Sequence, residues 1–207
     1  MDFRLFNREF GNADLFLIDL ILKGMFREDK NILDAGCGEG RNLDFFLRNN
    51  FDVYGADKNE SALRMLVYKL KASGKNFDDK HFVRCDLTEI PFEEDYFDYI
   101  ICLAVLHFAQ SRNHFVAMYE KIISVLKPGG FVFIGMNSTI GSENAIFDQA
   151  TGLYQLPGGE IRFLLDDTLL QFILSDKRLR QTEPLRTIIV HGYESRSYLI
   201  FEKKNNS

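Results

Sequence analysis

The sequence predicts an α/β fold with a mostly parallel sheet and helices on both faces. Short apolar runs typical of strands alternate along the chain with segments of helical periodicity. Each of the first three predicted strands ends on or beside an aspartate, at Asp34, Asp57 and Asp86, and glycines follow the first strand directly. Because ligands bind beyond the carboxyl ends of strands in open α/β sheets, these three carboxylates are expected to meet in one crevice.

The first half of the chain supplies five of the expected strands. An N-terminal helix is predicted over about 13–25, with Asn12 as its cap and an apolar stripe that includes Leu15 and Ile18. Strands are expected at 31–35, 51–56, 81–85, 97–103 and 130–136. Further helices are expected at about 41–49, 60–73 and 114–126. Residues 127–130, Lys-Pro-Gly-Gly, predict a turn that ends the last of these helices.

The second half begins with a long segment of no clear period. Residues 137–162 hold several glycines and are too long for an ordinary connection inside a compact domain, so 137–165 is interpreted as an insertion on the substrate side. A helix at about 166–174 and β-rich runs at 186–191 and 197–203 would complete a seven-stranded sheet with an antiparallel hairpin. Residues 203–207 are expected to fray.

The glycine loop departs from the dinucleotide-binding pattern. It has the form G-x-G-x-G over 36–40, and Arg41 stands where the third glycine of a dinucleotide fingerprint would be. Glycines at this density let a ligand approach the backbone amides closely, and Asp57 is placed to accept from both ribose hydroxyls. An acidic rim disfavours a pyrophosphate and favours a cationic nucleoside such as S-adenosylmethionine.

Four segments in order resemble the class I S-adenosylmethionine-dependent methyltransferases. They are LDAGCGEG at 33–40, VYGAD at 53–57, RCDL at 84–87 and LKPGG at 126–130. Residues 96–108 are similar to the family's fourth strand and the loop after it, so the resemblance spans 31–136, about half of the chain. Residues 36–42 and 52–59 are also similar to tellurite-resistance methyltransferases, a likeness that fades after Lys127. The resemblance implies a Rossmann-like seven-stranded sheet and S-adenosylmethionine as cofactor.

The resemblance also assigns roles at the methionine end of the cofactor. Asp34 and the backbone of the glycine loop would hold this end, and Arg41, expected at the start of the next helix, would pair with the methionine carboxylate. The loop residues concerned are Gly36, Cys37, Gly38 and Gly40. The carbonyl of Leu103 would face the methionine ammonium. An exposed position for Arg41 on the first helical turn is the alternative.

A second set of residues would hold the adenosyl part. The resemblance places Asp57 on the ribose hydroxyls and Lys58 beside the adenine. Asp86 would accept from adenine N6, and the amide of Leu87 would donate to the ring.

The acceptor would lie between the N-terminal segment, the loop after the fourth strand and the long insertion. Candidates there are Phe3, Phe6, Phe10, His107, Tyr154 and Arg162. His107 has the chemistry of a general base, with a structural histidine as the alternative. The phenylalanines would stack on the substrate or simply pack in a core of a chain with 20 Phe. Tyr154 and Arg162 would contact substrate or only anchor the insertion, with Arg162 paired to Asp166.

Composition favours one domain over 1–207, with 1–30 as its N-terminal helical segment. A chain of 207 residues that is 46% apolar can bury a single core. The net charge of -5 argues against a nucleic-acid partner, and no apolar run approaches a membrane span. Three widely spaced cysteines fit neither a disulfide framework nor a metal site, so a cytoplasmic location is expected.

These observations predict a methyltransferase that acts on a small-molecule acceptor by O-, N- or S-methylation. An N-P-P-Y motif and a Pro-Cys pair, which nucleic-acid methylation would favour, are absent from the sequence. Two alternatives stay open at this level. One is an NAD-dependent oxidoreductase with a divergent glycine loop, and the other is a non-catalytic subunit that binds S-adenosylmethionine. The sequence carries no signal for oligomeric state.

Overall fold

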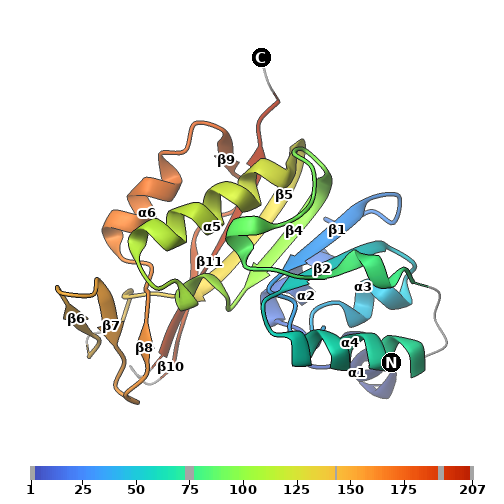
Figure 1. Cartoon of the computed structure of the whole chain (residues 1–207), viewed down its shortest axis with the longest axis horizontal. Helices are drawn as coiled ribbons and strands as arrows, with labels where there is room; N and C mark the ends of the chain where they lie inside the picture. The colour runs from blue at the N-terminus through green and yellow to red at the C-terminus, as the bar shows by residue number, and fades with distance from the viewer. Residues whose placement is uncertain (1–2, 73–76, 143, 191–193, 206–207) are drawn as a thin grey trace.

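The computed structural model describes residues 3–72, 77–142, 144–190 and 194–205, and it describes Phe3, Phe6 and Arg8 without their side chains. Its main sheet has the strand order β10-β11-β5-β4-β1-β2-β3, and β9 pairs with β11 (Figure 1). The strands are β1 (Asn31–Ala35), β2 (Asp52–Asp57), β3 (Phe82–Arg84), β4 (Phe97–Leu103), β5 (Leu126–Asn137), β9 (Leu179–Gln181), β10 (Arg186–Val190) and β11 (Glu194–Lys203). Strands β1 to β5 are parallel, whereas β11 is antiparallel to β5, β9 and β10. The predicted α/β class and C-terminal hairpin are confirmed.

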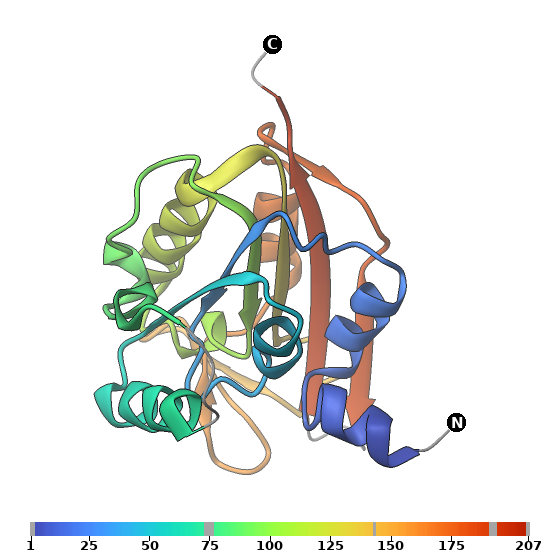
Figure 2. The ribbon, with the colours of Figure 1, turned by 90° about the vertical axis from the view of Figure 1, so that its right-hand side faces the viewer.

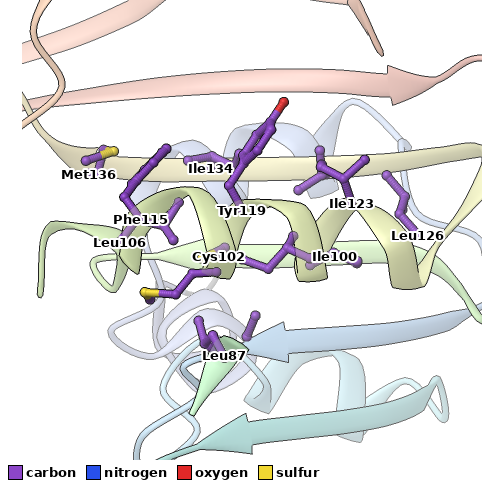
Figure 3. Close-up of a cluster of buried hydrophobic side chains, with 14 of the residues drawn as sticks. Leu87, Ile100, Cys102, Leu106, Phe115, Tyr119, Ile123, Leu126, Ile134 and Met136 are labelled. Atoms are coloured by element: carbon purple, nitrogen blue, oxygen red, sulfur yellow. The ribbon is translucent and has the colours of Figure 1, made fainter. Parts of the chain in front are cut away.

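Helices cover both faces of this sheet, as Figures 1 and 2 show. They are α1 (Phe3–Phe10), α2 (Leu15–Leu22), α3 (Asp44–Arg48), α4 (Glu60–Ala72), α5 (Arg112–Val125) and α6 (Asp167–Leu174), with short 3-10 turns η1 (Asp79–His81), η2 (Leu87–Glu89) and η3 (Leu106–Phe108). On one face, α5 packs on Ile100, Cys102 and Ile134 (Figure 3), and α6 adds Leu169 and Ile173 to the same cluster. On the other face, α2, α3 and α4 pack on Ile32 and Ile101. Alternate residues of each strand therefore feed two separate apolar layers.

Two predicted helices begin later than their sequences indicated. Helix α2 starts at Leu15 with Asp14 as its cap, whose carboxylate accepts from the Phe16 amide at 3.0 Å, so the prediction of Asn12 as cap was wrong. Gly11 ends the separate helix α1 with φ +54, which leaves Asn12 in the linker. Helix α3 begins only at Asp44. Arg41 therefore lies in the turn before the helix and not on its first turn.

The predicted turn at 127–130 is a bulge inside β5. Phe97 pairs with Leu126 and Tyr99 with Phe131, so four residues of β5 lie opposite the single residue Asp98. A side chain at Gly130 would meet the carbonyl oxygen of Asp98 at 2.7 Å, which explains a glycine there. Helix α5 ends at Val125 as expected, but the chain enters the strand at once.

The insertion folds into a small antiparallel sheet that the sequence did not predict. Its strands are β6 (Ile146–Asp148), β7 (Leu153–Gln155) and β8 (Ile161–Arg162), in the order β6-β7-β8. Strands of two or three residues with exposed side chains carry no readable alternation. The Leu165 amide donates to Asn137 and the Thr139 amide to Leu165, so both ends of the insertion meet where β5 ends. Figure 1 places the small sheet beside the carboxyl ends of β4 and β5.

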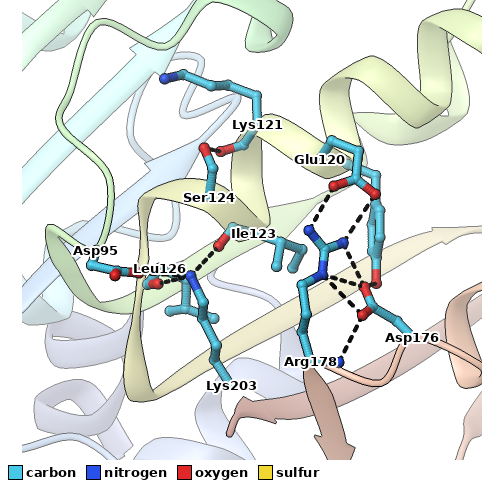
Figure 4. A network of polar contacts seen from close by, with 10 residues as sticks. Asp95, Glu120, Lys121, Ile123, Ser124, Leu126, Asp176, Arg178 and Lys203 are labelled. Atoms are coloured by element: carbon cyan, nitrogen blue, oxygen red, sulfur yellow. Dashed lines mark hydrogen bonds and ion pairs between the residues drawn. The ribbon is translucent and has the colours of Figure 1, made fainter. Parts of the chain in front are cut away.

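The end of the chain is held more firmly than the sequence indicated. Lys203 lies in β11, and its ammonium donates to Asp95 Oδ1 at 2.7 Å and to two backbone carbonyls at the end of α5 (Figure 4). The expectation that fraying begins at Lys203 was wrong. Residues 206–207 lie outside the described part of the chain. No described helix has the length and apolarity needed to cross a membrane.

Arg178 joins α5 to the segment after α6. Its guanidinium donates to both carboxylate oxygens of Glu120, at 2.7 and 2.9 Å, and to Asp176 (Figure 4). The Tyr119 hydroxyl also donates to Asp176, at 2.9 Å. Burial raises the pKa of Asp176, but hydrogen bonds from Arg178 and Tyr119 outweigh it and hold the pKa below its ordinary value.

We expect Asp176→Asn to lower the free energy of unfolding at neutral pH by about 1–3 kcal/mol, because charge-assisted hydrogen bonds are lost. A depressed folded pKa adds stability that is present above the unfolded pKa of about 3.9 and is lost as pH falls through the folded value. Denaturant titrations at several pH values should therefore show the gap between variant and wild type closing below about pH 4. Asp29→Asn, at an exposed aspartate paired with Arg27, is the control. A gap that stays constant with pH would contradict this account.

Candidate active site

The glycine loop turns sharply at the carboxyl end of β1. Gly36, Gly38 and Gly40 have φ of +88°, +52° and +82°, a region that L side chains rarely adopt. The Gly36 amide donates to the Ala56 carbonyl at 2.7 Å, which fixes the loop against β2. A Cβ at Gly36 would lie 2.1 Å from Cγ2 of Val105. Position 36 therefore requires glycine both for its conformation and for space.

Asp57, at the end of β2, fixes the glycine loop through a hydrogen bond to its backbone. Its Oδ2 accepts from the Gly38 amide at 2.8 Å, and its Oδ1 accepts from the Asn59 amide at 2.7 Å. Asn59 in turn caps α4 by accepting from Ser61 and Ala62. One carboxylate thus connects the glycine loop to the start of α4, and each of its oxygens keeps a further lone pair for a ligand.

Asp34 is buried beneath the loop with an unsatisfied acceptor. The residue is 1% exposed, and its buried Oδ2 has no hydrogen-bond partner in the part of the chain that the structure describes. Burial raises the pKa of Asp34 to about 7, against the opposing charge of Arg41 and with a smaller contribution from Asp57. A buried acceptor atom without a partner is costly to a fold, so Asp34 Oδ2 is a candidate to receive a hydrogen bond from a ligand.

A first cavity of about 170 Å³ opens between β2, β3 and β4. It is lined by Gly36, Asp57, Lys58, Asn59, Cys85, Asp86, Leu87, Ala104, Val105, Phe108, His114 and Met118. Asp86 accepts from the Thr88 amide at 3.0 Å and lies 3.4 Å from His114 Nε2. His114 Nδ1 accepts from the Gln110 amide, so Nε2 carries the proton and donates to Asp86. Burial opposes ionisation of Asp86, but these hydrogen bonds hold its pKa below its ordinary value.

A second cavity, of about 440 Å³, lies on the other side of the glycine loop. Its lining is Asn12, Gly36, Cys37, Gly38, Glu39, Gly40, Arg41, Asn42, Asp44, Lys69, Leu103 and Ala104. Arg41 donates from Nη1 to the Asn12 carbonyl at 3.2 Å, which holds the guanidinium over the loop. Gly36 and Ala104 line both cavities, so the two adjoin at the ends of β1 and β4.

A third cavity, of about 390 Å³, lies under the insertion. It is lined by Ala104, His107, Phe108, Asn137, Leu156, Gly158, Glu160, Arg162, Glu194 and Arg196. His107 is 5% exposed, and its Nδ1 lies 3.4 Å from the Asn137 amide that donates to it. Burial, with the charges of Arg162 and Arg196, lowers the pKa of His107 to about 4. The imidazole is therefore neutral near pH 7, with its proton on Nε2.

Ala104 lines all three cavities in a conformation unusual for alanine. Its φ is +61°, and its amide donates to the Gly135 carbonyl at 2.8 Å. A non-glycine residue in this region costs about 1–2 kcal/mol and persists where the surrounding structure enforces it. The kink at the end of β4 turns the chain away from the sheet and leaves open the space that the three cavities share.

Comparison with known proteins matches this architecture to one family. Residues 32–130 match the model of a methyltransferase domain. Residues 32–130 therefore form a methyltransferase domain, and the fold is that of S-adenosylmethionine-dependent methyltransferases. A tRNA (carboxymethyluridine(34)-5-O)-methyltransferase of Arabidopsis thaliana is 31% identical over 103 residues, which are 50% of this chain and 23% of that protein. The chain spans less than half of the length of several curated relatives that it matches.

Solved structures share the fold across nearly the whole chain. The PH0226 protein of Pyrococcus horikoshii superposes with a TM-score of 0.73 at 18% identity and covers 98% of each chain. The 1,6-didemethyltoxoflavin-N1-methyltransferase of Burkholderia thailandensis superposes with a TM-score of 0.68 at 19% identity, over 99% of this chain and 83% of that one. That enzyme was solved with bound 1,6-didemethyltoxoflavin and S-adenosylhomocysteine. At this level of identity, the likeness concerns the fold.

The methyltransferase fold brings the predicted cofactor residues together around the glycine loop, although Asp34 is buried beneath the loop and lines neither the first nor the second cavity. Asp57, Lys58, Asp86 and Leu87 line the first cavity with Gly36. The second cavity is lined by the other predicted residues of the glycine loop, Cys37, Gly38 and Gly40, and by Arg41 and Leu103. The Cys37 thiol is buried and its pKa is raised by burial, which keeps it protonated. The individual roles of these residues remain predictions.

The predicted acceptor residues do not gather in one place. His107 and Arg162 line the third cavity, whereas Tyr154 donates to Asp166 at 3.1 Å and is not among the lining residues. Phe10 is buried and stacks on Phe45. The side chains of Phe3 and Phe6 lie outside the described part of the structure. Arg162 forms no ion pair with Asp166, because Asp166 caps α6 and accepts from Tyr154 instead, so the expectation of that pair was wrong.

Several lining residues were missed by sequence reasoning. His114 and Met118 reach the first cavity from α5, and Phe108 lies between the first and third cavities. Their positions follow from how α5 packs across the sheet, and no spacing in the sequence marks them. Glu194 and Arg196 reach the third cavity from β11, nearly ninety residues after His107 along the chain. For Arg196, the alternation of side chains along β11 was the only sequence signal, and it indicates a face of the sheet but not a cavity.

Gly36→Ala tests the requirement for glycine at the loop. We expect a loss of about 1–2 kcal/mol in unfolding free energy from the positive φ, and about 1–3 kcal/mol more because the new Cβ overlaps Val105. Gly152→Ala is the matched control, since Gly152 has φ +72° and no atom within 4 Å of its Cβ position. Equal losses in urea unfolding for the two variants would contradict the packing argument.

Proposed function

We propose that the protein transfers a methyl group from S-adenosylmethionine to a small-molecule acceptor. The observation that carries the proposal is the buried Asp34 Oδ2, which has no hydrogen-bond partner among the described residues, beneath a glycine loop that Asp57 holds between two adjoining cavities. A ligand with a nucleoside at one end and an amino acid at the other suits such a pair of cavities. Its sulfonium and ammonium are both cationic, which suits acidic surroundings.

The first cavity would take the adenosyl part. Asp57 accepts from the ribose hydroxyls there, Lys58 lies beside the adenine, and Asp86 with the Leu87 amide recognises the base. The His114 bond that keeps the pKa of Asp86 low also keeps this carboxylate an acceptor. The second cavity would take the methionine part, with Arg41 on the carboxylate. Asp34 and the Leu103 carbonyl face the ammonium, whose charge would favour the ionised form of Asp34.

Methyl transfer depends mainly on the position of the acceptor nucleophile relative to the methyl group. The acceptor nucleophile forms a bond to the methyl carbon as the carbon–sulfur bond breaks, and the electron pair stays on sulfur as a neutral thioether. An acceptor that carries a proton on its nucleophile releases it to solvent. Holding nucleophile and methyl group in line contributes roughly 7–11 kcal/mol to lowering the barrier. His107, with Nδ1 occupied and Nε2 protonated, would donate a hydrogen bond to the acceptor and orient it.

The third cavity supports a small acceptor. It adjoins the other two at Ala104 and is lined from the insertion and β11. The net charge of -5 disfavours a nucleic-acid backbone as partner. The three cysteines are unpaired, which fits a reducing compartment such as the cytoplasm. We also treat 1–207 as one methyltransferase domain with the insertion at 137–165 on its acceptor side.

The alternatives make different predictions about ligands. An NAD-dependent oxidoreductase would bind NAD, and Arg41 in place of the fingerprint glycine counts against it. A non-catalytic subunit would bind S-adenosylmethionine without turnover. A tRNA acceptor, named for the Arabidopsis relative, would appear as methyl transfer to RNA.

Two measurements test the proposal together. Calorimetry should detect binding of S-adenosylhomocysteine and none of NAD, with Asp57→Ala weakening the affinity roughly tenfold or more, because charge-assisted bonds to the ribose are lost. Asp148→Ala is the matched control, since Asp148 accepts from the Ala150 amide in the same local geometry but lies in the insertion. Tritiated S-adenosylmethionine should label a small-molecule fraction of a cell extract. Binding without any labelling, or labelling confined to tRNA or protein, would overturn the acceptor class.

A further inference from the structure

Two arginines line the acceptor cavity from separate parts of the fold. Arg162 belongs to β8 of the insertion, and Arg196 belongs to β11 of the main sheet. Arg196 pairs across the sheet with Asn137, whose amide donates to His107. The main sheet therefore places Arg196 next to His107, and the insertion supplies a second guanidinium to the same cavity.

Arg162 has open hydrogen-bonding capacity. Its Nη1 donates to the Ile161 carbonyl at 2.9 Å, and its guanidinium lies over the Phe108 ring at 4.9 Å. Among the described residues, no carboxylate lies within 4.0 Å of it, although most arginines of this structure have such a partner. A guanidinium has five N–H donors and is always charged. This cation–π contact holds the guanidinium beside Phe108 and leaves several of its N–H donors for a ligand.

Arg196 contributes a buried donor without a partner. Its Nη2 donates to Glu194 Oε1 at 2.6 Å, but its Nε is buried and has no hydrogen-bond partner among the described residues. A buried unsatisfied N–H of a charged group is costly, as the Asp34 oxygen is on the cofactor side. The site therefore has two unsatisfied hydrogen-bonding groups of opposite kind. Asp34 Oδ2, beneath the glycine loop, can accept a hydrogen bond, and Arg196 Nε, at the third cavity, can donate one.

The charges around the cavity favour a monoanion. Its lining holds two arginines and two glutamates, Glu160 and Glu194, which sum to zero at neutral pH. Glu194 is already paired with Arg196, and Glu160 is exposed. The charges of both arginines contribute to the low pKa of His107, which shows that both guanidinium groups lie near the inner end of the cavity. A dianionic phosphate would meet the two carboxylates at short range, whereas a single planar carboxylate matches a guanidinium fork.

We propose that the methyl acceptor is a small carboxylic acid whose carboxylate is bound by the Arg162 guanidinium, which lies over Phe108, and by the unpartnered Nε donor of Arg196. This inference rests on the proposed function, since it names the class of molecule that enters the acceptor cavity. The carboxylate fixes the orientation of the acceptor, with its nucleophile turned toward the methyl group near Ala104. Arg162 and Arg196 are then positioning residues for the substrate.

Nuclear magnetic resonance of arginine side chains tests this binding without knowledge of the true acceptor. The ¹⁵N-arginine-labelled protein, saturated with S-adenosylhomocysteine, is titrated with acetate and benzoate and, in parallel, with acetamide and benzamide. We expect the acids to shift the Nε–H signals of Arg162 and Arg196, and the amides to leave them in place. Arg162→Gln should weaken acid binding roughly tenfold, and Arg162→Lys, which keeps the charge without the fork, less than that.

Arg180→Gln is the matched control, because Arg180 is an exposed arginine of β9 paired with Glu202. Calorimetry with S-adenosylhomocysteine on the same samples distinguishes failure of the proposed function from failure of the carboxylic-acid proposal. If S-adenosylhomocysteine does not bind, the proposed function fails. If it binds, the acid proposal alone is overturned when neither acid shifts Arg162 or Arg196 at millimolar concentration, when the amides act equally, or when Arg180→Gln weakens acid binding as much as Arg162→Gln.

Discussion

The hydrogen bond from the Gly38 amide to the Asp57 carboxylate is the interaction on which the site depends. It connects the loop after β1 to the end of β2 and, through Asn59, to the start of α4. Parallel strands place their carboxyl ends at one edge, so one side chain there can hold a loop and meet a ligand at once. The loop adopts positive φ at its glycines because these residues lack a Cβ, and this bond and the Gly36 contact with β2 select that conformation.

The cofactor side of the fold could be predicted from the sequence because its signals are local. The alternation of strands and helices gave the α/β class, and the glycines after β1 with aspartates after β1, β2 and β3 gave the edge at which the cavities lie. Boundaries were less reliable where capping decides them. Asp14, not Asn12, caps helix α2. Helix α3 begins at Asp44, so Arg41 lies in the turn before it. Neither outcome changes which side of the loop these residues line.

The acceptor side could not be predicted in the same way. Its lining is contributed by η3, the end of β5, the insertion and β11, and contact between such distant segments depends on tertiary packing. The insertion carried no period because its strands are two or three residues long. Arg162 was a candidate with the wrong expected partner, and Arg196 was not a candidate at all. The left-handed backbone conformation of Ala104 could not be predicted from the sequence, because that conformation is typical of glycine and not of alanine.

Hydrogen–deuterium exchange with and without S-adenosylhomocysteine tests the central claim most directly, because it reads the loop, the ends of the strands and the insertion in one experiment. The account predicts slower exchange on binding in peptides that cover 36–41, 57–59, 86–88 and 103–105, with little change in β6 and β7. Unchanged exchange in the first four segments at saturating ligand, or protection confined to the insertion, would contradict the claim that the glycine loop and the strand-end aspartates form the cofactor site.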